Sequence, residues 1–407
     1  MKIIIVSDYA RIAGGAYKIA IASALAFAER GHEVEFFAGN APVGPELAAA
    51  PRIKVTCLDD GPHSRDPKRL RGAMRGLYYR RAAREMRNVL SRCDRKDTVV
   101  HLHAYRETLT TSVAHAAIKM GFVTVYTAHE YTMGCPYGGF FDYRRNSVCP
   151  ERGLSLGCLK TRCNTSGYGN KLWYYLAGFV YSKICRIPAR LSHVVFISKL
   201  NQRVLLPYLP SGARHTIVPN AGDSDAAEGA KIMADSPFVF VGSLEPFKDP
   251  LIAARCARSL GAPIVFVGAG SLEGEIRNVN PGAVVTGWVG KEEVDAHLRQ
   301  ARALIFPSIW YEAQPCTTME AAARGLPLIV SDRSAAVEQV ELLGVGEVFK
   351  GGDASDLEAK MRPYLDADFA RTQGKRTREA YAKLDFSNDL HVARLLDMYK
   401  SELARQS

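Results

Sequence analysis

The sequence predicts an α/β protein made of two doubly wound domains, each built on a parallel β-sheet. Short apolar runs rich in Val and Ile alternate with amphipathic stretches along the whole chain. Many of these runs are apolar without alternation, which is typical of strands buried on both faces of a parallel sheet. The pattern starts again after a polar segment that begins at residue 223, and 407 residues are too many for one ordinary core.

The expected strands share this apolar composition, and helical patterns lie between many of them. In the first half the strands are residues 2–7, 34–37, 54–57, 98–102, 123–127 and 194–197, and in the second half 238–241, 264–267, 284–286, 304–307 and 328–331. Helices are expected at residues 16–29, 251–260, 291–300 and 389–403. We expect an N-terminal domain at residues 1–222, a second domain at 223–385, and a helix at 386–407 that packs back on the first. Ligands of such sheets bind beyond the carboxyl ends of the strands, so the sites are expected in a cleft between facing domains.

Composition and charge limit the function classes. Apolar residues make up 47% and charged residues 23% of the chain, which indicates a globular protein. No apolar run is long enough to span a bilayer, and the first run reads as a buried strand because no cleavage site follows it. We therefore expect a cytoplasmic protein. The net charge of +11 is compatible with nucleic acid, an anionic membrane surface or phosphorylated small molecules as partners.

The most informative segment is 306–327, which reads FPSIWYEAQPCTTMEAAARGLP. A buried strand ends at Pro307, a polar loop follows, and Gly325 and Pro327 close the next helix. Backbone N–H groups at a helix start suit phosphate, and the carboxylates of Glu312 and Glu320 suit sugar hydroxyls. The alternative is that Glu312 is a loop surface charge and Glu320 a first-turn acid favoured by the helix dipole. The pair within one string favours the binding interpretation.

This string resembles the Glu, seven residues, Glu motif of retaining glycosyltransferase family 4, whose fold is GT-B. The resemblance implies that Glu312 contacts the donor sugar and Glu320 the nucleotide ribose. It also implies that the loop of Gln314, Pro315, Cys316 and Thr317 meets the sugar and the diphosphate.

Further segments resemble donor-binding elements of that family. Gly242, Ser243 and Lys248 correspond to a strand-end motif in which an Arg and a Lys grip the diphosphate, but Ser243 stands where Arg is common. A cation at Lys248 would stabilise the leaving diphosphate, whereas alone it would read as an exposed Lys. Weaker matches are Gly268, the pair Trp288 and Val289 near the base, and the loop of Gly14 and Gly15. The three spaced glycines of a dinucleotide fingerprint are missing from that loop, which disfavours NAD.

The acceptor is expected at the ends of strands in the first half. His129 follows a buried strand and matches a histidine that the family places beside the transferred sugar, although a core histidine is the alternative. His103 and Tyr131 are placed near the acceptor. With Glu312 and Lys248, His129 completes the predicted catalytic set.

The cysteines suggest a metal. Nine cysteines are an odd count for a chain expected in the cytosol, so structural disulfides are not expected. Cys135, Cys149, Cys158 and Cys163 cluster in one loop, and four thiolates can hold tetrahedral zinc. We expect a structural zinc there and no cofactor for catalysis; free thiols are the alternative.

Two segments of the first half suggest a membrane surface. A run of arginines from Arg65 to Arg87 carries Leu70 and Met74 on an apolar face, which reads as a helix for an anionic bilayer. The aromatic stretch at 171–181 is flanked by Lys183 and Arg186. The alternatives are a solvated basic face and a buried helix.

These features predict an enzyme that transfers a sugar from a nucleotide-diphosphate carrier to a lipid-linked or saccharide acceptor in surface glycan synthesis. It is expected to work at the inner leaflet of the membrane. Three rivals remain: a nucleotide-sugar epimerase of similar fold, a protein that binds nucleic acid or membranes without catalysis, and an inactive relative. The pairing of basic with aliphatic residues disfavours nucleic acid as a partner.

Overall fold

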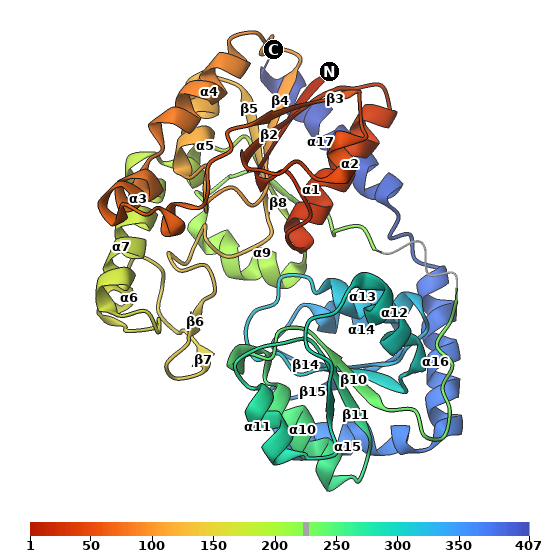
Figure 1. The fold of residues 1–407 in the computed structure, drawn as a ribbon. Helices are drawn as coiled ribbons and strands as arrows, with labels where there is room; N and C mark the ends of the chain where they lie inside the picture. Colours follow the sequence, from red (N-terminus) through yellow and green to blue (C-terminus); the bar gives the residue numbers. More distant parts are fainter. Residues whose placement is uncertain (223–227, 407) are drawn as a thin grey trace. The chain divides into compact units, whose positions relative to one another are not determined.

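The computed structural model describes residues 1–222 and 228–406, which divide into two compact units (Figure 1). Unit 1 contains Met1–Gly139, Glu151–Ala221 and the chain from Asn388 onward, and unit 2 contains Phe140–Pro150 and Gly222–Ser387. The linker expected from residue 223 lies largely outside the described residues, since 223–227 are not among them. Both units are α/β with parallel sheets, so the predicted fold class is confirmed.

Unit 1 is built on a seven-stranded parallel sheet with the order β3-β2-β1-β4-β5-β8-β9. Its strands are β1 (Lys2–Tyr9), β2 (Glu33–Asn40), β3 (Ile53–Cys57), β4 (Thr98–Leu102), β5 (Val123–Ala128), β8 (His193–Phe196) and β9 (His215–Ile217). The strand order reverses between β1 and β4. Because parallel crossovers are right-handed, the helices that follow β1 and β4 lie on opposite faces of the sheet.

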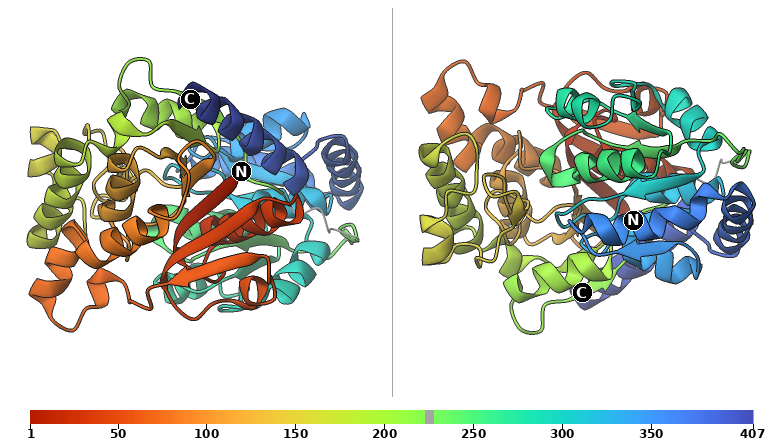
Figure 2. Two further views of the ribbon diagram at one scale, coloured as in Figure 1. Left: turned by 90° about the horizontal axis from the view of Figure 1, so that it is seen from above. Right: turned by 90° about the horizontal axis from the view of Figure 1, so that it is seen from below.

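The helices of unit 1 come from both ends of the chain. They are α1 (Gly15–Glu29), α2 (Pro45–Ala48), α3 (Arg69–Leu77), α4 (Arg80–Leu90), α5 (Thr111–Lys119), α6 (Leu156–Lys160), α7 (Tyr168–Phe179), α8 (Ile187–Arg190), α9 (Lys199–Leu205) and α17 (Asn388–Gln406). The C-terminal helix α17 packs beside α1 and near β4 and β5, as the dark blue helix of Figure 2 shows.

Helix α17 is held in unit 1 by apolar and charged contacts. Leu395 and Tyr399 are fully buried in the same core cluster as Phe27 of α1. The Glu402 carboxylate is 2% exposed and accepts hydrogen bonds from Arg214 Nε at 2.9 Å, and it lies 3.1 Å from His193 Nδ1. A buried carboxylate needs such partners, so these contacts determine where the helix docks.

Unit 2 is built on a six-stranded parallel sheet with the order β12-β11-β10-β13-β14-β15. Its strands are β10 (Phe238–Val241), β11 (Ile264–Val267), β12 (Val284–Val285), β13 (Ala303–Phe306), β14 (Leu328–Ser331) and β15 (Glu347–Phe349). Its helices are α10 (Pro250–Ser259), α11 (Glu273–Val279), α12 (Lys291–Gln300), α13 (Cys316–Ala323), α14 (Ala336–Leu343), α15 (Ala354–Met361) and α16 (Ala367–Ala382). Apolar clusters fill both faces of the sheet.

A small hairpin extends unit 2. Strands β6 (Phe141–Asp142) and β7 (Ser147–Val148) pair antiparallel, and this segment belongs to unit 2 although the expected first domain included it. The ring of Phe141 lies 6.4 Å from that of Phe247, and the ring of Tyr143 lies 5.9 Å from it. Aromatic packing of this kind explains why the hairpin associates with unit 2.

The arginine-rich run forms two helices, α3 and α4, rather than the single helix expected. Tyr78 and Tyr79 between them have extended backbones. The Tyr79 hydroxyl donates to Asp60 at 2.6 Å, its backbone N–H donates to Thr110 at 3.2 Å, and the Tyr78 hydroxyl lies 3.1 Å from His115 Nδ1. These contacts replace the helical hydrogen bonds at the break.

We predict that Leu395→Ala destabilises unit 1 by about 2–5 kcal/mol, because it removes a fully buried side chain and leaves a cavity. Urea unfolding followed by hydrogen exchange of unit 1 peptides measures this change. Arg394→Ala on the exposed face of the same helix is the matched control and should change stability by less than about 0.5 kcal/mol. Equal effects of the two substitutions would contradict the packing of α17.

Candidate functional site

Lys248 and Glu312 meet at the carboxyl end of the unit 2 sheet. Lys248 closes a short turn after β10, and Glu312 lies in the loop after β13, the neighbouring strand. The two loops are joined by the Ile309 N–H, which donates to the Phe247 carbonyl at 3.0 Å. Parallel neighbours end at the same edge of a sheet, so the two side chains come together although 64 residues separate them.

The Glu312 carboxylate is the centre of this arrangement. Its Oε1 forms an ion pair with the Lys248 ammonium and accepts hydrogen bonds from Trp310 Nε1 at 2.5 Å and from the Ser308 hydroxyl at 3.3 Å. The Lys248 ammonium also lies 5.4 Å from the ring centre of Phe306. Both charged side chains are mostly but not fully buried, at 18% and 14% exposed. They therefore remain accessible to a ligand at the strand ends.

Helix α13 begins beside this pair. Pro315 precedes its first residue, Cys316, and the Thr318 hydroxyl donates back to the Pro315 carbonyl at 2.9 Å. The N–H groups of the first turn have no partners within a helix and can bind an anion. Gln314 lies two residues before α13, and Thr317 is the second residue of the helix.

Glu320 is the fifth residue of α13 and half-buried. It therefore lies beyond the first turn, which is where the helix dipole favours an acidic side chain. The dipole alone thus does not account for Glu320. The backbone carbonyl of Glu320 accepts from Arg324 at 2.7 Å, which places that arginine one turn further on.

The predicted glycines lie where the strands of unit 2 end. A Cβ atom on Gly268 would stand 2.0 Å from the Gly242 carbonyl oxygen, so the two turns approach each other more closely than a side chain allows. Gly268 has φ +147°. Ser243 is exposed in the same turn. Trp288 is 85% exposed, and Gly287 before it bridges to Gly268, which leaves a large aromatic ring available at this edge.

The remaining predicted donor residues are half-buried or exposed. Val289 is half-buried after Trp288, and Gly14 and Gly15 are exposed in unit 1, where α1 begins at Gly15.

The two predicted histidines of unit 1 are brought together. His103 follows β4 and His129 follows β5, and His103 Nδ1 lies 2.9 Å from His129 Nε2. Burial lowers the pKa of His129 to about 3 and lowers the pKa of His103 well below its usual value. Both imidazoles are therefore neutral at physiological pH, and His129 can accept or donate a hydrogen bond. Tyr131 is buried.

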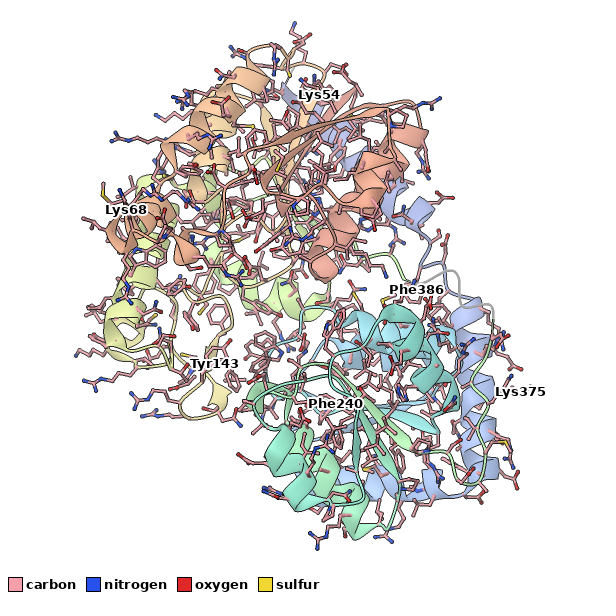
Figure 3. All side chains as sticks on the ribbon, viewed as in Figure 1. Lys54, Lys68, Tyr143, Phe240, Lys375 and Phe386 are labelled. Carbon is pink, nitrogen blue, oxygen red and sulfur yellow. The ribbon has the colours of Figure 1, made fainter. Side chains whose placement is uncertain are left out.

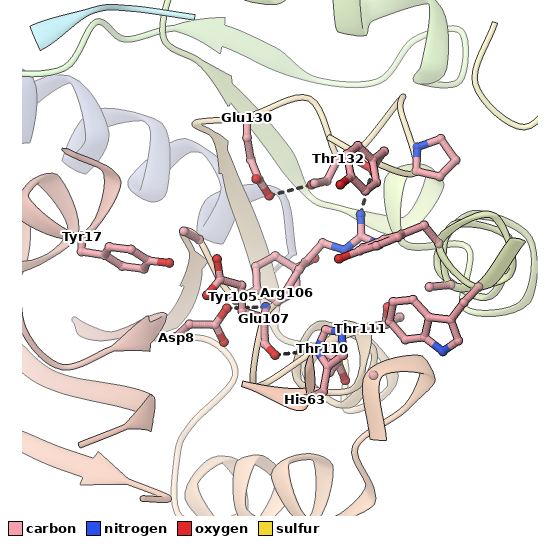
Figure 4. Close-up of a pocket in the computed structure, with 17 residues that line it drawn as sticks. Asp8, Tyr17, His63, Tyr105, Arg106, Glu107, Thr110, Thr111, Glu130 and Thr132 are labelled. Atoms are coloured by element: carbon pink, nitrogen blue, oxygen red, sulfur yellow. Dashed lines mark hydrogen bonds between the residues drawn. The ribbon is translucent and has the colours of Figure 1, made fainter. Parts of the chain in front are cut away.

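A cavity of about 200 Å³ opens beyond the same strand ends of unit 1 (Figure 4). Carboxylates, a guanidinium and aromatic rings line it. They include Asp8, Tyr17, Arg106, Glu107, Glu130 and Trp173. Carboxylates and aromatic faces together suit a polyhydroxylated ligand, since hydroxyls donate to the former and C–H faces pack on the latter.

Hydrogen bonds fix these acids. Asp8 accepts three backbone N–H groups, from Glu107 at 2.6 Å, Thr108 at 2.9 Å and Leu109 at 2.9 Å. Burial nevertheless raises the pKa of Asp8 to about 7. Burial also raises the pKa of Glu130, against the opposing effects of Arg106 and of the Thr132 hydroxyl, which donates to it at 2.9 Å.

Sequence reasoning did not assign these cavity residues. Asp8 lies near the carboxyl end of β1, after its apolar run and Ser7, and Glu130 lies two residues beyond β5. The rule that ligands bind beyond the carboxyl ends of strands was a signal that could have identified both. Trp173 and Tyr17 come from helices, and only tertiary packing places them there.

An exposed apolar surface lies on α3, α6 and α7, which are neighbours in Figures 1 and 2. Trp173 Nε1 of α7 donates to the Ala73 carbonyl of α3 at 3.1 Å and joins two of these helices. The exposed side chains of the surface are Leu70, Met74, Leu156, Tyr168, Leu172, Leu176 and Phe179, together with Ile184 of the π-helical turn that follows α7. Within residues 1–222 and 228–406, no helix has the length and apolar character needed to cross a membrane.

Several arginines of this region are paired within unit 1. Arg71 forms an ion pair with Asp66 at 2.8 Å, and Arg81 with Asp60 at 2.9 Å. Lys68, Arg69 and Arg80 are exposed, and no described residue forms an ion pair with them; Figure 3 shows Lys68 at the outer edge of unit 1. A groove of about 870 Å³ runs between α3 and the start of α4.

The predicted zinc ligands do not form a metal site in the described residues. No three His, Cys, Asp or Glu side chains among them are grouped to hold a metal ion. Cys149 belongs to unit 2, whereas Cys135, Cys158 and Cys163 belong to unit 1. Cys158 and Cys163 contact the ammonium of Lys171 instead. The residues present do not fit a Cys₄ zinc site.

Comparisons with known proteins agree with this architecture. Residues 236–367, within unit 2, match the family described as "Glycosyl transferases group 1". Among curated protein sequences, no match was found. The prediction that the protein is a glycosyltransferase is confirmed at the level of this domain.

Solved structures of similar fold cover almost the whole chain. Sucrose-phosphate synthase from Thermosynechococcus elongatus has 17% identity and a TM-score of 0.73, with 99% of each chain covered. HepE of Anabaena in complex with UDP has 13% identity and a TM-score of 0.66, covering 98% of this chain and 100% of that one. The lipopolysaccharide outer core galactosyltransferase WaaB has 14% identity and a TM-score of 0.64, covering 99% and 100%. All three share the two-domain GT-B fold with this chain.

We predict that unit 1 loses stability as pH falls from 7 towards 5. The pKa values of His101, His103 and His129 are lowered in the folded state, mainly by burial, whereas an unfolded histidine has a pKa of about 6.5. The unfolded chain then binds more protons, so the free energy of unfolding falls by up to about 1.4 kcal/mol per pH unit for each histidine. Urea unfolding at several pH values measures the slope. His129→Gln removes one of these histidines, so it should reduce the pH dependence of the unfolding free energy by up to about 1.4 kcal/mol per pH unit. An unchanged slope would contradict the lowered pKa of His129.

Proposed function

We propose that this protein is a retaining glycosyltransferase that moves a sugar from a nucleotide-diphosphate donor to a lipid-linked or saccharide acceptor at the cytoplasmic face of a membrane. The observation that carries the proposal is the Lys248–Glu312 pair beside the start of α13, inside the segment that matches the glycosyltransferase family. Cation, sugar-binding acid and helix start are the groups that a nucleotide-sugar donor requires at one strand edge.

The donor is assigned to unit 2. Lys248 and the first N–H groups of α13 would bind the diphosphate and stabilise the charge that develops on it as the glycosidic bond breaks. Glu312 has its Oε1 engaged by three donors, so Oε2 is the oxygen that would accept a sugar hydroxyl. Glu320 would accept from the ribose and Trp288 would stack on the base. HepE of Anabaena, which has the same fold, is solved with UDP and with UDP-glucose.

The Lys248–Glu312 ion pair would also prepare the site for the nucleotide-diphosphate donor. Without a donor the Lys248 ammonium is neutralised by this carboxylate, which avoids an unpaired charge in a mostly buried place. A diphosphate would offer the ammonium a second anion and leave Glu312 available to hydroxyls. In the retaining chemistry that the motif implies, the acceptor oxygen bonds to the anomeric carbon on the face that the leaving phosphate occupied. The departing phosphate takes the acceptor proton, so no catalytic metal is needed.

The acceptor is assigned to unit 1. The cavity of about 200 Å³ has the mixture of carboxylates and aromatic rings that suits a sugar. His129 and His103 are neutral neighbours at the adjoining strand ends and would position a hydroxyl by hydrogen bonding. The cavity and the hollow next to it share His63, Trp173 and Tyr174, which connects the strand ends with the helices of the apolar surface.

The membrane partner is assigned to the apolar surface of α3, α6 and α7. Leu70 and Leu156 are 76% and 74% exposed, and the exposed cations Lys68 and Arg80 line the same groove as Leu70. Arg69 directly precedes Leu70 in the chain. Apolar side chains surrounded by cations complement an anionic bilayer, whose headgroups are negative and whose interior is apolar. The net charge of +11 favours the same partner. A lipid-linked acceptor would then reach unit 1 from the membrane on which the protein lies.

We predict that Lys248→Met lowers kcat by about 10²–10³-fold, because the leaving diphosphate loses its cation. The assay is nucleotide release from a panel of nucleotide sugars, with membrane extract as the source of acceptors. Glu320→Ala should raise the KM for the donor. Lys375→Met removes an exposed lysine of α16 in the same unit and is the matched control; Figure 3 shows this lysine at the surface.

Folded wild-type protein that releases no nucleotide from any donor would contradict the transferase proposal. NMR of the product's anomeric proton tests the retaining mechanism separately, since an inverted configuration would overturn it and leave the transferase intact.

We predict that the double substitution Leu70→Glu and Met74→Glu weakens binding to vesicles containing phosphatidylserine by at least about tenfold. It removes two exposed apolar side chains and adds negative charge near an anionic surface. Vesicle sedimentation at low and high salt measures the change. The matched control is Leu342→Glu, at a leucine of unit 2 that is 55% exposed. Equal loss in both proteins, or equal binding to neutral vesicles, would contradict this surface.

A further inference from the structure

A buried ammonium lies between two cysteine sulfur atoms in unit 1. Lys171 Nζ is 3.4 Å from Cys158 Sγ and 3.3 Å from Cys163 Sγ. The three residues are 1%, 5% and 3% exposed. Cys158 belongs to α6, Cys163 to the irregular chain that follows, and Lys171 to the first turn of α7. Three consecutive segments therefore bring these atoms together.

The charge of Lys171 has no carboxylate partner among residues 1–222 and 228–406, and its side-chain hydrogen bonds go to the two sulfurs. A buried ammonium without an anion is costly, and a neutral thiol is only a weak acceptor. The ammonium therefore lies where it would stabilise negative charge on either sulfur. A thiolate is the nucleophilic form of cysteine, so the same arrangement makes one sulfur reactive.

Cys256 of unit 2 shows the contrast. It is buried as well, but its thiol donates to the Ala354 carbonyl at 3.3 Å, and burial raises its pKa to about 11. Such a cysteine stays a thiol and is inert. Burial is therefore common to Cys256, Cys158 and Cys163. Contact with a buried ammonium sets Cys158 and Cys163 apart from Cys256.

The same geometry disfavours the zinc expected from the cysteine spacing. An ammonium cannot coordinate a cation and repels one, and Lys171 stands between two of the four expected ligands. Two neighbouring thiols that do not bind a metal can still form a disulfide. Because both sulfurs contact one nitrogen atom, they are at most two hydrogen-bond lengths apart. Cys163 lies between α6 and α7, outside regular secondary structure.

We propose that Cys158 and Cys163 form a redox-active dithiol that closes to a reversible disulfide, with Lys171 as the positioning residue that keeps one sulfur reactive. The oxidant is hydrogen peroxide. The thiolate sulfur attacks one peroxide oxygen and the O–O bond breaks. The leaving hydroxide takes a proton from the Lys171 ammonium and becomes water, which leaves a sulfenic acid.

The second thiol then attacks the sulfur of that sulfenic acid. The S–S bond forms, the S–O bond breaks, and the hydroxyl leaves as water with the proton of the second thiol. Two electrons pass from the sulfurs to the peroxide, which ends as two waters. Lys171 is left as a neutral amine, which suits a buried position once its anionic partner is gone. Reduction by a dithiol restores the starting state.

The experiment uses the full chain, reduced and then freed of reductant. Hydrogen peroxide is added, free thiols are alkylated at intervals, and peptides are mapped by mass spectrometry. We expect a linkage between Cys158 and Cys163 that dithiothreitol reverses, while Cys256 stays alkylatable. Lys171→Met should slow closure by at least about tenfold, and Lys171→Arg, which keeps a cation, should retain most of the rate.

Cys158→Ser provides a second variant if Lys171→Met does not fold, and it should form no linkage at Cys163. Equal oxidation rates in wild type and Lys171→Met, or oxidation of Cys256 as fast as that of Cys163, would overturn the proposal. One zinc per chain, bound by wild type purified without chelator and lost in Cys158→Ser, would also overturn it. None of these readouts uses glycosyl transfer, so the result is independent of the proposed function.

Discussion

Parallel pairing of neighbouring strands is the constraint on which the rest of this structure depends. Each strand of both sheets runs in the same direction as its neighbour, so the loops that carry polar residues all leave at one edge. Lys248 and Glu312 meet because β10 and β13 are adjacent, and His103 and His129 meet because β4 and β5 are adjacent. Buried apolar strands thus act as the rigid support on which distant parts of the chain assemble one site in each unit.

Charge in these sites is balanced before any ligand binds. Glu312 neutralises Lys248, backbone N–H groups surround Asp8, and the buried histidines are neutral because burial lowers their pKa values. The cost of burying an isolated charge explains each arrangement. On the proposed function, an incoming diphosphate or sugar would exchange partners with groups that are already oriented, which would limit the reorganisation needed during reaction.

Unit 1 combines features that the chain separates widely. The first strand, the aromatic helix α7 and the C-terminal helix α17 all belong to it, and Gly76 allows α3 to approach Trp173, where a Cβ atom would stand 2.4 Å from the ring. This close helix contact joins the lining of the cavity to the apolar surface. The proposed binding of acceptor and membrane therefore depends on one packed set of helices.

The sequence could predict most strands to within a residue or two, since apolar runs such as 238–241 and 264–267 must be buried whatever their neighbours are. It missed β9 and β15, which are three residues long, and the two-residue strands β6 and β7, because so few residues carry no periodic pattern. The arginine-rich run was predicted as one helix, because its break depends on hydrogen bonds of Tyr78 and Tyr79 to residues far along the chain.

For the sites, the sequence by itself determined the residues whose local pattern carries chemistry: Glu312 and Glu320 around a helix start, Lys248 after a strand, and His129 at a strand end. Tertiary structure decided which groups they meet. It paired Lys248 with Glu312, brought Tyr17 and Trp173 into the cavity of Asp8 and Glu130, and placed Lys171 between two cysteines that spacing alone assigned to zinc. The physical reason is that pattern in a sequence reports burial and local backbone geometry, whereas partners across a sheet or between helices depend on the packing of the whole unit.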